Sequence, residues 1–183
     1  MIIKSIIRFV LVLQFLFPVY ANAKSVLHEK MGKLSTLVGD WSQEHYTYSE
    51  EGTWEKTGTS NLKLSKSLSD LMISGETRDM VPAEGMNLEL SFTYDLYRKI
   101  YRMSVVDSIY GLMDIYEGEF NQDGHLMLTN INKDTFFPVE NGAMHFRFTF
   151  KDDDPDKISC FIEQTSDAGE KWSPMLNYIM TRQ

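Results

Sequence analysis

The chain has 183 residues, of which 24% are charged and 13% are aromatic, and its formal net charge at pH 7 is -8. This length suits one domain with a sizeable core, and a negative surface repels nucleic-acid phosphates, so we expect no nucleic-acid partner. The single cysteine, Cys160, excludes an intrachain disulfide. Because Ile158 and Ile162 flank it at alternate positions, we expect Cys160 to be a buried apolar residue.

The first residues have the pattern of a cleaved secretory signal peptide. Lys4 and Arg8 are followed by a short apolar run, and Ala21-Asn22-Ala23 supplies a small-x-small cleavage pattern. The run is shorter than the ~20 residues that span a bilayer. We therefore expect residues 1–23 to be a signal peptide and residues 24–183 to be a periplasmic or secreted mature chain without a membrane span. Removing two positive charges leaves 16 Lys and Arg against 26 Asp and Glu, a formal charge of -10.

The mature chain is predicted to start with a short helix and to continue as strands. Apolar residues lie at roughly helical spacing between Ser25 and Thr36. From Leu37 onward apolar and polar residues alternate, most clearly in 88–94 and 144–150, and only an extended strand puts each set on its own face. Weaker alternation predicts strands at 41–48, 54–64, 71–77, 99–106, 112–120, 125–131, 157–165 and 175–182.

The connections between these segments indicate the fold class. They are short and rich in Gly, Asp and Asn, whereas parallel strands need crossovers of about a dozen residues or more. The longest gap runs from about 133 to 141, so a Greek-key sandwich with long connections is the less favoured alternative. We expect one all-β domain, an antiparallel up-and-down β-barrel of about 8–10 strands with a short N-terminal helix, because closure removes exposed sheet edges.

The segment before the first predicted strand resembles a known superfamily. Leu37-Val38-Gly39-Asp40-Trp41 is similar to the G-x-W opening of the lipocalin and calycin proteins. The resemblance implies that Trp41 plugs the closed end of the barrel beneath an arginine of the last strand. Arg182 is the matching candidate, and we expect Trp41 and Arg182 to have a structural role.

A second resemblance covers nearly the whole mature chain. The set that carries it is Gly39-x-Trp41, Thr57-Gly58-Thr59, Phe92-x-Tyr94-Asp95 with Tyr101, Val106-Asp107-Ser108, Glu117 to Gly124, and Thr181-Arg182. In this order the set resembles a family of exported bacterial proteins catalogued as a domain of unknown function. The resemblance implies a calycin-like barrel and brings no established activity. One departure is Leu68-Ser69-Asp70, which stands where a Gly-rich turn is expected.

The predicted inner faces supply candidate ligand-binding residues. A barrel of about eight or more strands can be filled by side chains or can hold one small ligand. Both alternatives stay open, and the second is a cavity rich in aromatic residues and methionine for a small apolar molecule. The candidate lining residues are Leu90, Phe92, Tyr94, Met103, Asp114, Tyr116, Met127, Phe146, Phe148 and Ile162.

No motif for a metal or cofactor stands out, so none is predicted. The four histidines, His28, His45, His125 and His145, include no pair at metal-ligand spacing, and we expect the strand histidines to face solvent. Haem is kept as a minor alternative without an assigned axial ligand. The acidic run 152–156 lacks the spacing and glycine of a calcium loop and is predicted to be a solvated hairpin connection.

Three functional hypotheses follow. The first is a binding module for a small apolar ligand, and we favour it over the second, a barrel enzyme such as an isomerase, cyclase or hydrolase. The enzyme would need an inward polar group, for which Asp114 is the best candidate because it shares a predicted face with Leu112 and Tyr116. Asp107-Ser108 at the barrel rim has no identifiable histidine partner, so no catalytic residue is assigned. The third is a filled barrel with a structural or interaction role in the cell envelope. The oligomeric state is not predicted.

Overall fold

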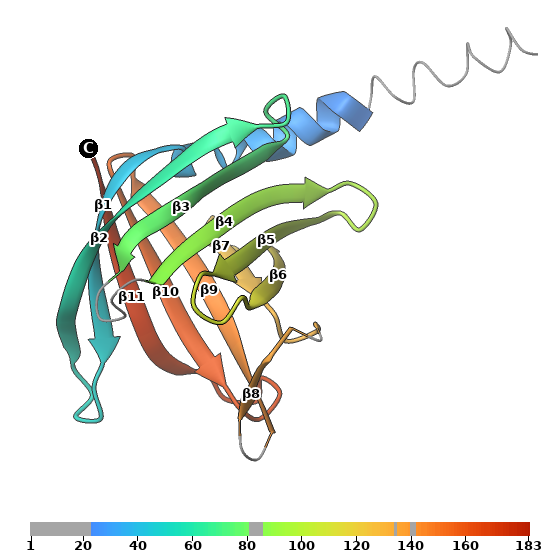
Figure 1. The fold of residues 1–183 in the computed structure, drawn as a ribbon. Helices are drawn as coiled ribbons and strands as arrows, with labels where there is room; N and C mark the ends of the chain where they lie inside the picture. Colours follow the sequence, from blue (N-terminus) through green and yellow to red (C-terminus); the bar gives the residue numbers. More distant parts are fainter. Residues whose placement is uncertain (1–22, 81–85, 134, 140–141) are drawn as a thin grey trace, which may run out of the picture.

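The computed structural model describes residues 23–80, 86–133, 135–139 and 142–183. Residues 1–22, which hold almost all of the predicted signal peptide, lie outside them. In the described part, eleven strands form one antiparallel sheet, and ten of these close into a barrel (Figure 1). The strands are β1 (Gly39–Tyr48), β2 (Trp54–Ser67), β3 (Met72–Met80), β4 (Met86–Asp95), β5 (Ile100–Asp107), β6 (Met113–Phe120), β7 (Leu126–Thr129), β8 (Phe137–Val139), β9 (Gly142–Asp154), β10 (Lys157–Thr165) and β11 (Ser173–Arg182).

The strand order confirms the predicted up-and-down barrel. Each barrel strand pairs antiparallel with its neighbour in the chain, except that β7 pairs with β9, and β1 pairs with β11 to close the ring. The small strand β8 pairs with the start of β9, beyond the end of β7. Every barrel strand overlaps a segment predicted from alternation, whereas β8 was not predicted. Three residues that include Pro138 are too few to show a period of two.

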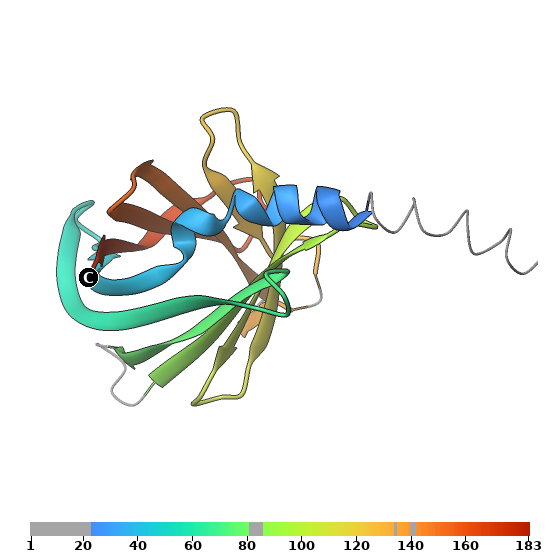
Figure 2. The ribbon, with the colours of Figure 1, turned by 90° about the horizontal axis from the view of Figure 1, so that it is seen from above.

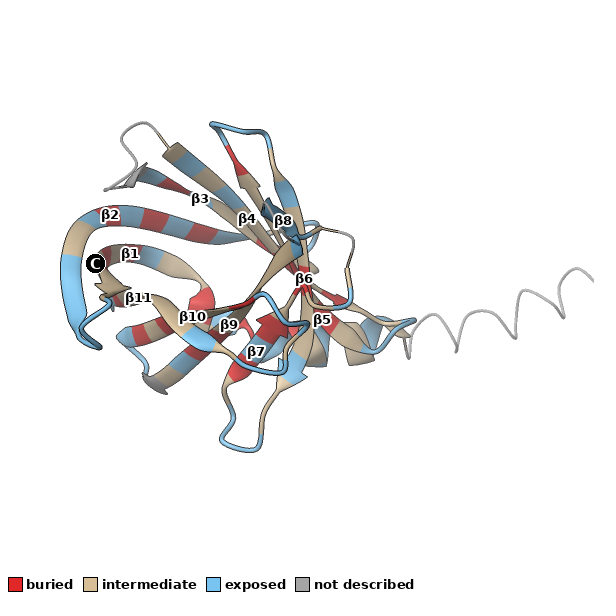
Figure 3. Cartoon of the chain, turned by 90° about the horizontal axis from the view of Figure 1, so that it is seen from below, coloured by how far each residue is buried: buried red, intermediate tan, exposed pale blue. Residues whose placement is uncertain are grey.

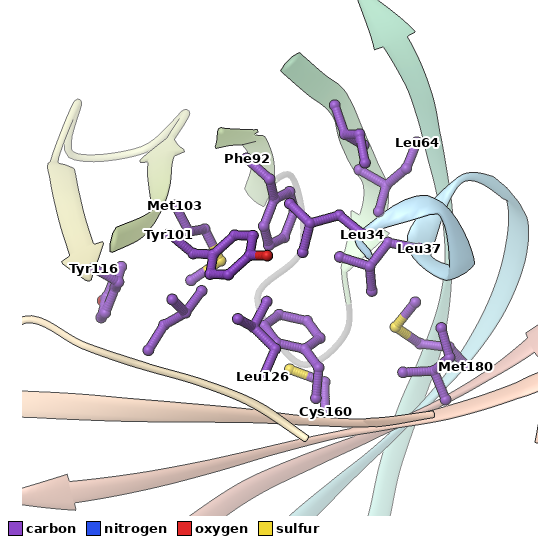
Figure 4. Close-up of a cluster of buried hydrophobic side chains, with 14 of the residues drawn as sticks. Leu34, Leu37, Leu64, Phe92, Tyr101, Met103, Tyr116, Leu126, Cys160 and Met180 are labelled. Atoms are coloured by element: carbon purple, nitrogen blue, oxygen red, sulfur yellow. The ribbon is translucent and has the colours of Figure 1, made fainter. Parts of the chain in front are cut away.

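A helical segment covers one end of the barrel. Residues 23–32 are helical, as predicted, and are followed by a 3-10 turn, η1 (Ser35–Leu37). The helix lies across the barrel end that is uppermost in Figure 1, and Figure 2 shows it crossing over the strands. Met31, Leu34 and Leu37 are buried there. They close this end of the barrel with an apolar layer, and Leu34 and Leu37 lie beside Phe92 and Met180 in Figure 4.

The alternation of side chains sets the inner face of the barrel. Along β2, buried residues such as Leu62 and Leu64 alternate with exposed ones, as the colours of Figure 3 show. The register pairs carry this face across β1 and β11, where Gln43 lies opposite Met180 and His45 opposite Tyr178. Gly75 of β3 lies on the same face, and an added Cβ there would approach the backbone oxygen of Lys63 at 1.7 Å, so only glycine fits.

Trp41 and Arg182 meet at the closed end. Trp41 is fully buried, and its indole Nε1 donates to the Leu37 carbonyl at 2.9 Å. Arg182 lies opposite Trp41 in the β1–β11 register, with its guanidinium 4.3 Å from the ring centroid. The structure therefore brings together the two residues to which the lipocalin resemblance gave a structural role.

Candidate ligand-binding cavity

The barrel encloses a cavity of about 350 Å³ on the side away from the helix. It extends from the ends of the strands near Met86, Leu112 and Met175 to the core near Phe92 and Phe150. Side chains from β1 to β6 and from β8 to β11 contribute to its wall. The lining residues are Gln43, His45, Thr47, Thr57, Leu62, Leu64, Thr77, Met86, Leu88, Leu90, Phe92, Val105, Asp107, Leu112, Asp114, Tyr116, Phe137, Phe146, Phe148, Phe150, Cys160, Ile162, Met175, Leu176, Tyr178 and Met180.

Large apolar side chains on this wall are only partly buried although they lie inside the barrel. Leu90, Val105, Phe146, Phe148 and Tyr178 all behave in this way. Since they contact the buried core and line the cavity, part of their accessible surface faces the cavity. The filled-barrel hypothesis requires side chains to fill the interior completely. The accessible surface of these residues shows that they do not.

Seven of the ten candidate lining residues lie on the cavity wall. They are Leu90, Phe92, Asp114, Tyr116, Phe146, Phe148 and Ile162. Tyr94 and Met103 are buried in the core but do not line the cavity. Met127 is 38% exposed, so its predicted inward position is wrong. Leu126, Met127 and Leu128 are all apolar, so the sequence could not tell which of them faces inward, and the structure buries Leu126 and Leu128.

Cys160 lies on the wall between Ile158 and Ile162 on β10. It is 4% exposed, and burial raises the pKa of its thiol. The thiol therefore stays protonated, as expected of an apolar core residue and not of a nucleophile.

A chain of three polar side chains crosses the β1–β2 side of the wall. His45 Nε2 and Ser60 Oγ are 2.8 Å apart, and Ser60 Oγ donates to Gln43 Oε1 at 2.9 Å. All three are buried, so the prediction that strand histidines face solvent is wrong for His45, which is 2% exposed. Counting by two from Trp41 reaches positions 43 and 45, so the sequence did contain this signal. It was obscured because these inward residues are polar.

Asp114 and Tyr116, both on β6, form a second polar group on the cavity wall. The Tyr116 hydroxyl donates to Asp114 Oδ2 at 2.8 Å, and Tyr116 packs edge-on against Phe148 with ring centroids 4.7 Å apart. Burial raises the pKa of the Asp114 carboxyl, and the hydrogen bond from Tyr116 opposes that shift. An inward carboxyl group on an apolar wall is what the sequence suggested for this position.

Asp107 also lines the cavity, but its oxygens organise the rim. Oδ1 accepts from the backbone N–H groups of Ile109 and Tyr110 at 2.9 and 2.6 Å, and Oδ2 accepts from that of Leu112 at 2.9 Å. Burial alone would raise the pKa of Asp107, but these donors outweigh it and lower the pKa. Ser108 Oγ accepts from the backbone N–H of Asn87 at 2.8 Å. Asp107 and Ser108 therefore stabilise the conformation of the β5–β6 loop and its contact with the start of β4.

Asn130 bridges the sheet where β7 ends. Its side chain is fully buried, its Oδ1 accepts from the Phe146 N–H at 2.7 Å, and its Nδ2 donates to the Thr135 carbonyl at 2.8 Å. Thr135 Oγ1 in turn accepts from the Ile115 N–H at 3.1 Å. These bonds link β6 to β9 where no strand lies between them, and nothing in the sequence pattern pointed to Asn130.

The sequence of the chain matches a known protein family over most of its length. Residues 28–182 match the family described as a protein of unknown function, DUF1579. The chain belongs to the DUF1579 family. No curated protein matches it.

Two solved structures resemble this DUF1579 barrel. The crystal structure of Rv2717c from M. tuberculosis has a TM-score of 0.55 at 15% identity, covering 82% of this chain and 94% of that one. The S-type phycobiliprotein lyase CPES from Guillardia theta has a TM-score of 0.45 at 13% identity, covering 81% of this chain and 89% of that one. The first likeness shows the fold and no more.

The described residues of this DUF1579 protein offer no cluster of three or more His, Cys, Asp or Glu suited to a metal ion. Within the same residues, no helix has the length and apolarity needed to cross a bilayer. The cavity wall offers apolar contact and, at two places, hydrogen-bonding groups: the Gln43-Ser60-His45 chain and the Asp114-Tyr116 pair.

Proposed function

We propose that this DUF1579 protein is exported and binds one small, largely apolar molecule inside its barrel. The observation that carries the proposal is the cavity of about 350 Å³, on whose wall Leu90, Phe146 and Phe148 retain accessible surface. Cavities of about 300–1,000 Å³ with mostly apolar linings and a few polar groups are typical of small-molecule sites. Filling the cavity would remove this remaining apolar surface from contact with water.

The volume limits the size of the ligand. A cavity of about 150 Å³ holds one benzene molecule, which has six carbon atoms. By that proportion, the cavity in this barrel holds roughly 14 non-hydrogen atoms. The ligand is then comparable in size to a twelve-carbon chain or to two to three fused rings.

The first experiment looks for the bound molecule. The mature protein is purified from its native periplasm or medium, extracted with organic solvent and analysed by mass spectrometry. We expect one compound class at near-stoichiometric amount. N-terminal sequencing of the same sample tests the export proposal, which expects a mature chain that begins at Lys24.

A matched pair of variants tests where the molecule binds. Leu90→Trp places a large ring in the cavity, whereas Met127→Trp places the same ring on the outer face of β7. Binding is followed with the neutral fluorescent probe 2-naphthol, whose two fused rings are within the size limit set by the cavity volume. We expect Leu90→Trp to abolish probe binding and Met127→Trp to leave it unchanged. Equal binding to both variants would contradict a site inside the barrel.

A barrel enzyme is the second candidate, because the Asp114 carboxyl lies on an apolar wall and is bonded to the Tyr116 hydroxyl. Burial raises the pKa of this carboxyl group, which is the direction that favours a carboxyl group acting as a general acid or base. If Asp114 performs such chemistry, the Asp114→Asn protein retains an unconverted substrate. The compound extracted from that variant would then differ in structure from the one extracted from the wild type.

A further inference from the structure

The carboxyl, ammonium and guanidinium groups that line the cavity are all of one sign. Two carboxyl groups, those of Asp107 and Asp114, line it, and among the described residues no lysine or arginine does. The chain as a whole has a formal net charge of -8. The potential at the cavity is therefore unfavourable for an anionic ligand and favourable for a cationic one.

The two carboxyl groups differ in what they can bind. Three backbone N–H groups of the β5–β6 loop occupy both oxygens of Asp107. Asp114 accepts on Oδ2 from Tyr116, and within the described part of the chain no donor bonds its Oδ1. Asp114 is therefore the lining carboxyl group with an oxygen available for a ligand.

The surroundings of Asp114 suit an organic cation. Leu112, Tyr116 and Phe148 lie on the same wall, and the aromatic rings of Tyr116 and Phe148 are in contact. Aromatic rings stabilise ammonium groups, and a hydrogen bond to a charged group is stronger than one between neutral groups. Asp114 is the second residue of β6, near the uncovered end of the barrel, so an ammonium group there leaves the deeper cavity for an apolar body.

We propose that the ligand is an apolar amine, with its ammonium group bound to Asp114 and its apolar body in the cavity between Phe92, Phe146 and Phe148. The proposal rests on the proposed function and deepens it by naming the ligand class. An amphiphile with the same apolar body but a carboxylate head group should bind weakly. Its negative charge would lie beside Asp114 and Asp107, and no lysine or arginine among the described residues of the wall would neutralise that charge.

The test compares three head groups on one chain length. Dodecylamine, dodecanol and dodecanoate, each below its solubility or micelle limit, compete with 2-naphthol for the protein at pH 7. We expect dodecylamine to bind about tenfold to a hundredfold more tightly than dodecanoate, the range given by one hydrogen bond to a charged group, with dodecanol between them.

A pair of charge-removing variants identifies the group responsible. Asp114→Asn acts inside the barrel, and Glu119→Gln removes the same charge from an exposed position of β6. We expect Asp114→Asn to reduce the affinity for dodecylamine to that for dodecanol while the affinity for dodecanol is kept. Glu119→Gln is expected to leave all three affinities unchanged.

The outcomes separate this proposal from the proposed function. Binding of dodecanoate as tight as that of dodecylamine, or an amine preference that survives in Asp114→Asn, would overturn the amine proposal while a ligand-binding cavity stands. If neither the probe nor any of the three compounds binds the wild-type protein, the proposed function itself fails.

Discussion

The guanidinium of Arg182, the second-to-last residue, stacks 4.3 Å from the centre of the Trp41 indole in the first strand. The same guanidinium donates to the carbonyls of Val38, Thr36 and Pro155. It thus connects β11 with the segment that leads into β1 and with the β9–β10 turn. The closure of the barrel depends on the pairing of these two end strands, and this side chain fixes their register.

We expect Arg182→Leu to destabilise the barrel by about 2.5–4 kcal/mol, because it removes a cation–π contact of about 1 kcal/mol and bonds to three carbonyls of about 0.5–1 kcal/mol each. Arg182→Lys keeps the charge, but a compact ammonium group lacks the planar fork with which the guanidinium reaches all three carbonyls and stacks on the indole, so it should recover only part of the loss. The measurement is urea denaturation, with the exposed Lys66→Ala as a control that should have little effect. A loss in Arg182→Leu no larger than that of the control would show that the stack does not stabilise closure.

The sequence predicted the barrel because most strands have one apolar and one polar face. β10 was predicted with its observed bounds, Lys157–Thr165. Prediction failed where that contrast is missing. In β7 three successive apolar residues gave Met127 the wrong face, and in β1 the inward residues Gln43 and His45 are polar, so their position could not be recognised from hydrophobicity.

The sequence predicted many of the residues that line the cavity, but it did not predict whether a cavity exists or how large it is. Phe146, Phe148 and Leu90 were assigned to the interior from alternation alone. Whether side chains fill a barrel depends on how closely opposite walls approach, which the order of residues along the chain does not contain. Asn130 was missed for a related reason, because its role depends on contacts with Phe146 and Thr135 across the gap beside β7.

The β2–β3 turn stores conformational strain that can be relieved. Leu68, Ser69 and Asp70 have φ of 48, 56 and 67°, a region that favours glycine. These are the residues that stand where the family resemblance led us to expect glycine. We expect Leu68→Gly to stabilise the protein by about 1 kcal/mol, since its side chain is 69% exposed and contributes little packing. Ser65 is exposed and has an extended backbone in β2, so Ser65→Gly should destabilise the protein by a similar amount. Thermal unfolding of both variants measures the difference.

Asp107 is expected to stabilise the rim at neutral pH. Its folded pKa is lowered, so its contribution is present above the unfolded value of about 3.9 and is lost as the pH falls through the folded pKa. Asp107→Asn replaces one acceptor oxygen with a donor and should cost about 1–3 kcal/mol at pH 7. Urea denaturation at several pH values should show this cost shrinking below about pH 4. The exposed Asp123→Asn is the matched control, and a cost independent of pH would refute the assignment.

Asp114 should show the opposite dependence on pH. Burial raises its folded pKa, so its protonated form stabilises the protein below the unfolded value of about 3.9, and this contribution is lost as the pH rises through the folded pKa. At pH 7 the half-buried carboxylate therefore reduces stability, and we expect Asp114→Asn to be more stable than the wild type. The gain should be at most about 1 kcal/mol, because solvent screens the charge.

Unfolding free energies of Asp114→Asn and wild type, measured from pH 3 to pH 8, should converge at the acidic end and separate above it. Glu119→Gln, which removes an exposed charge from the same strand, should follow the wild type throughout. A variant that is more stable but no longer prefers amines would show that this carboxyl group serves binding at the expense of stability. An Asp114→Asn protein less stable than the wild type at pH 7 would mean that the carboxylate has a stabilising partner in the folded protein.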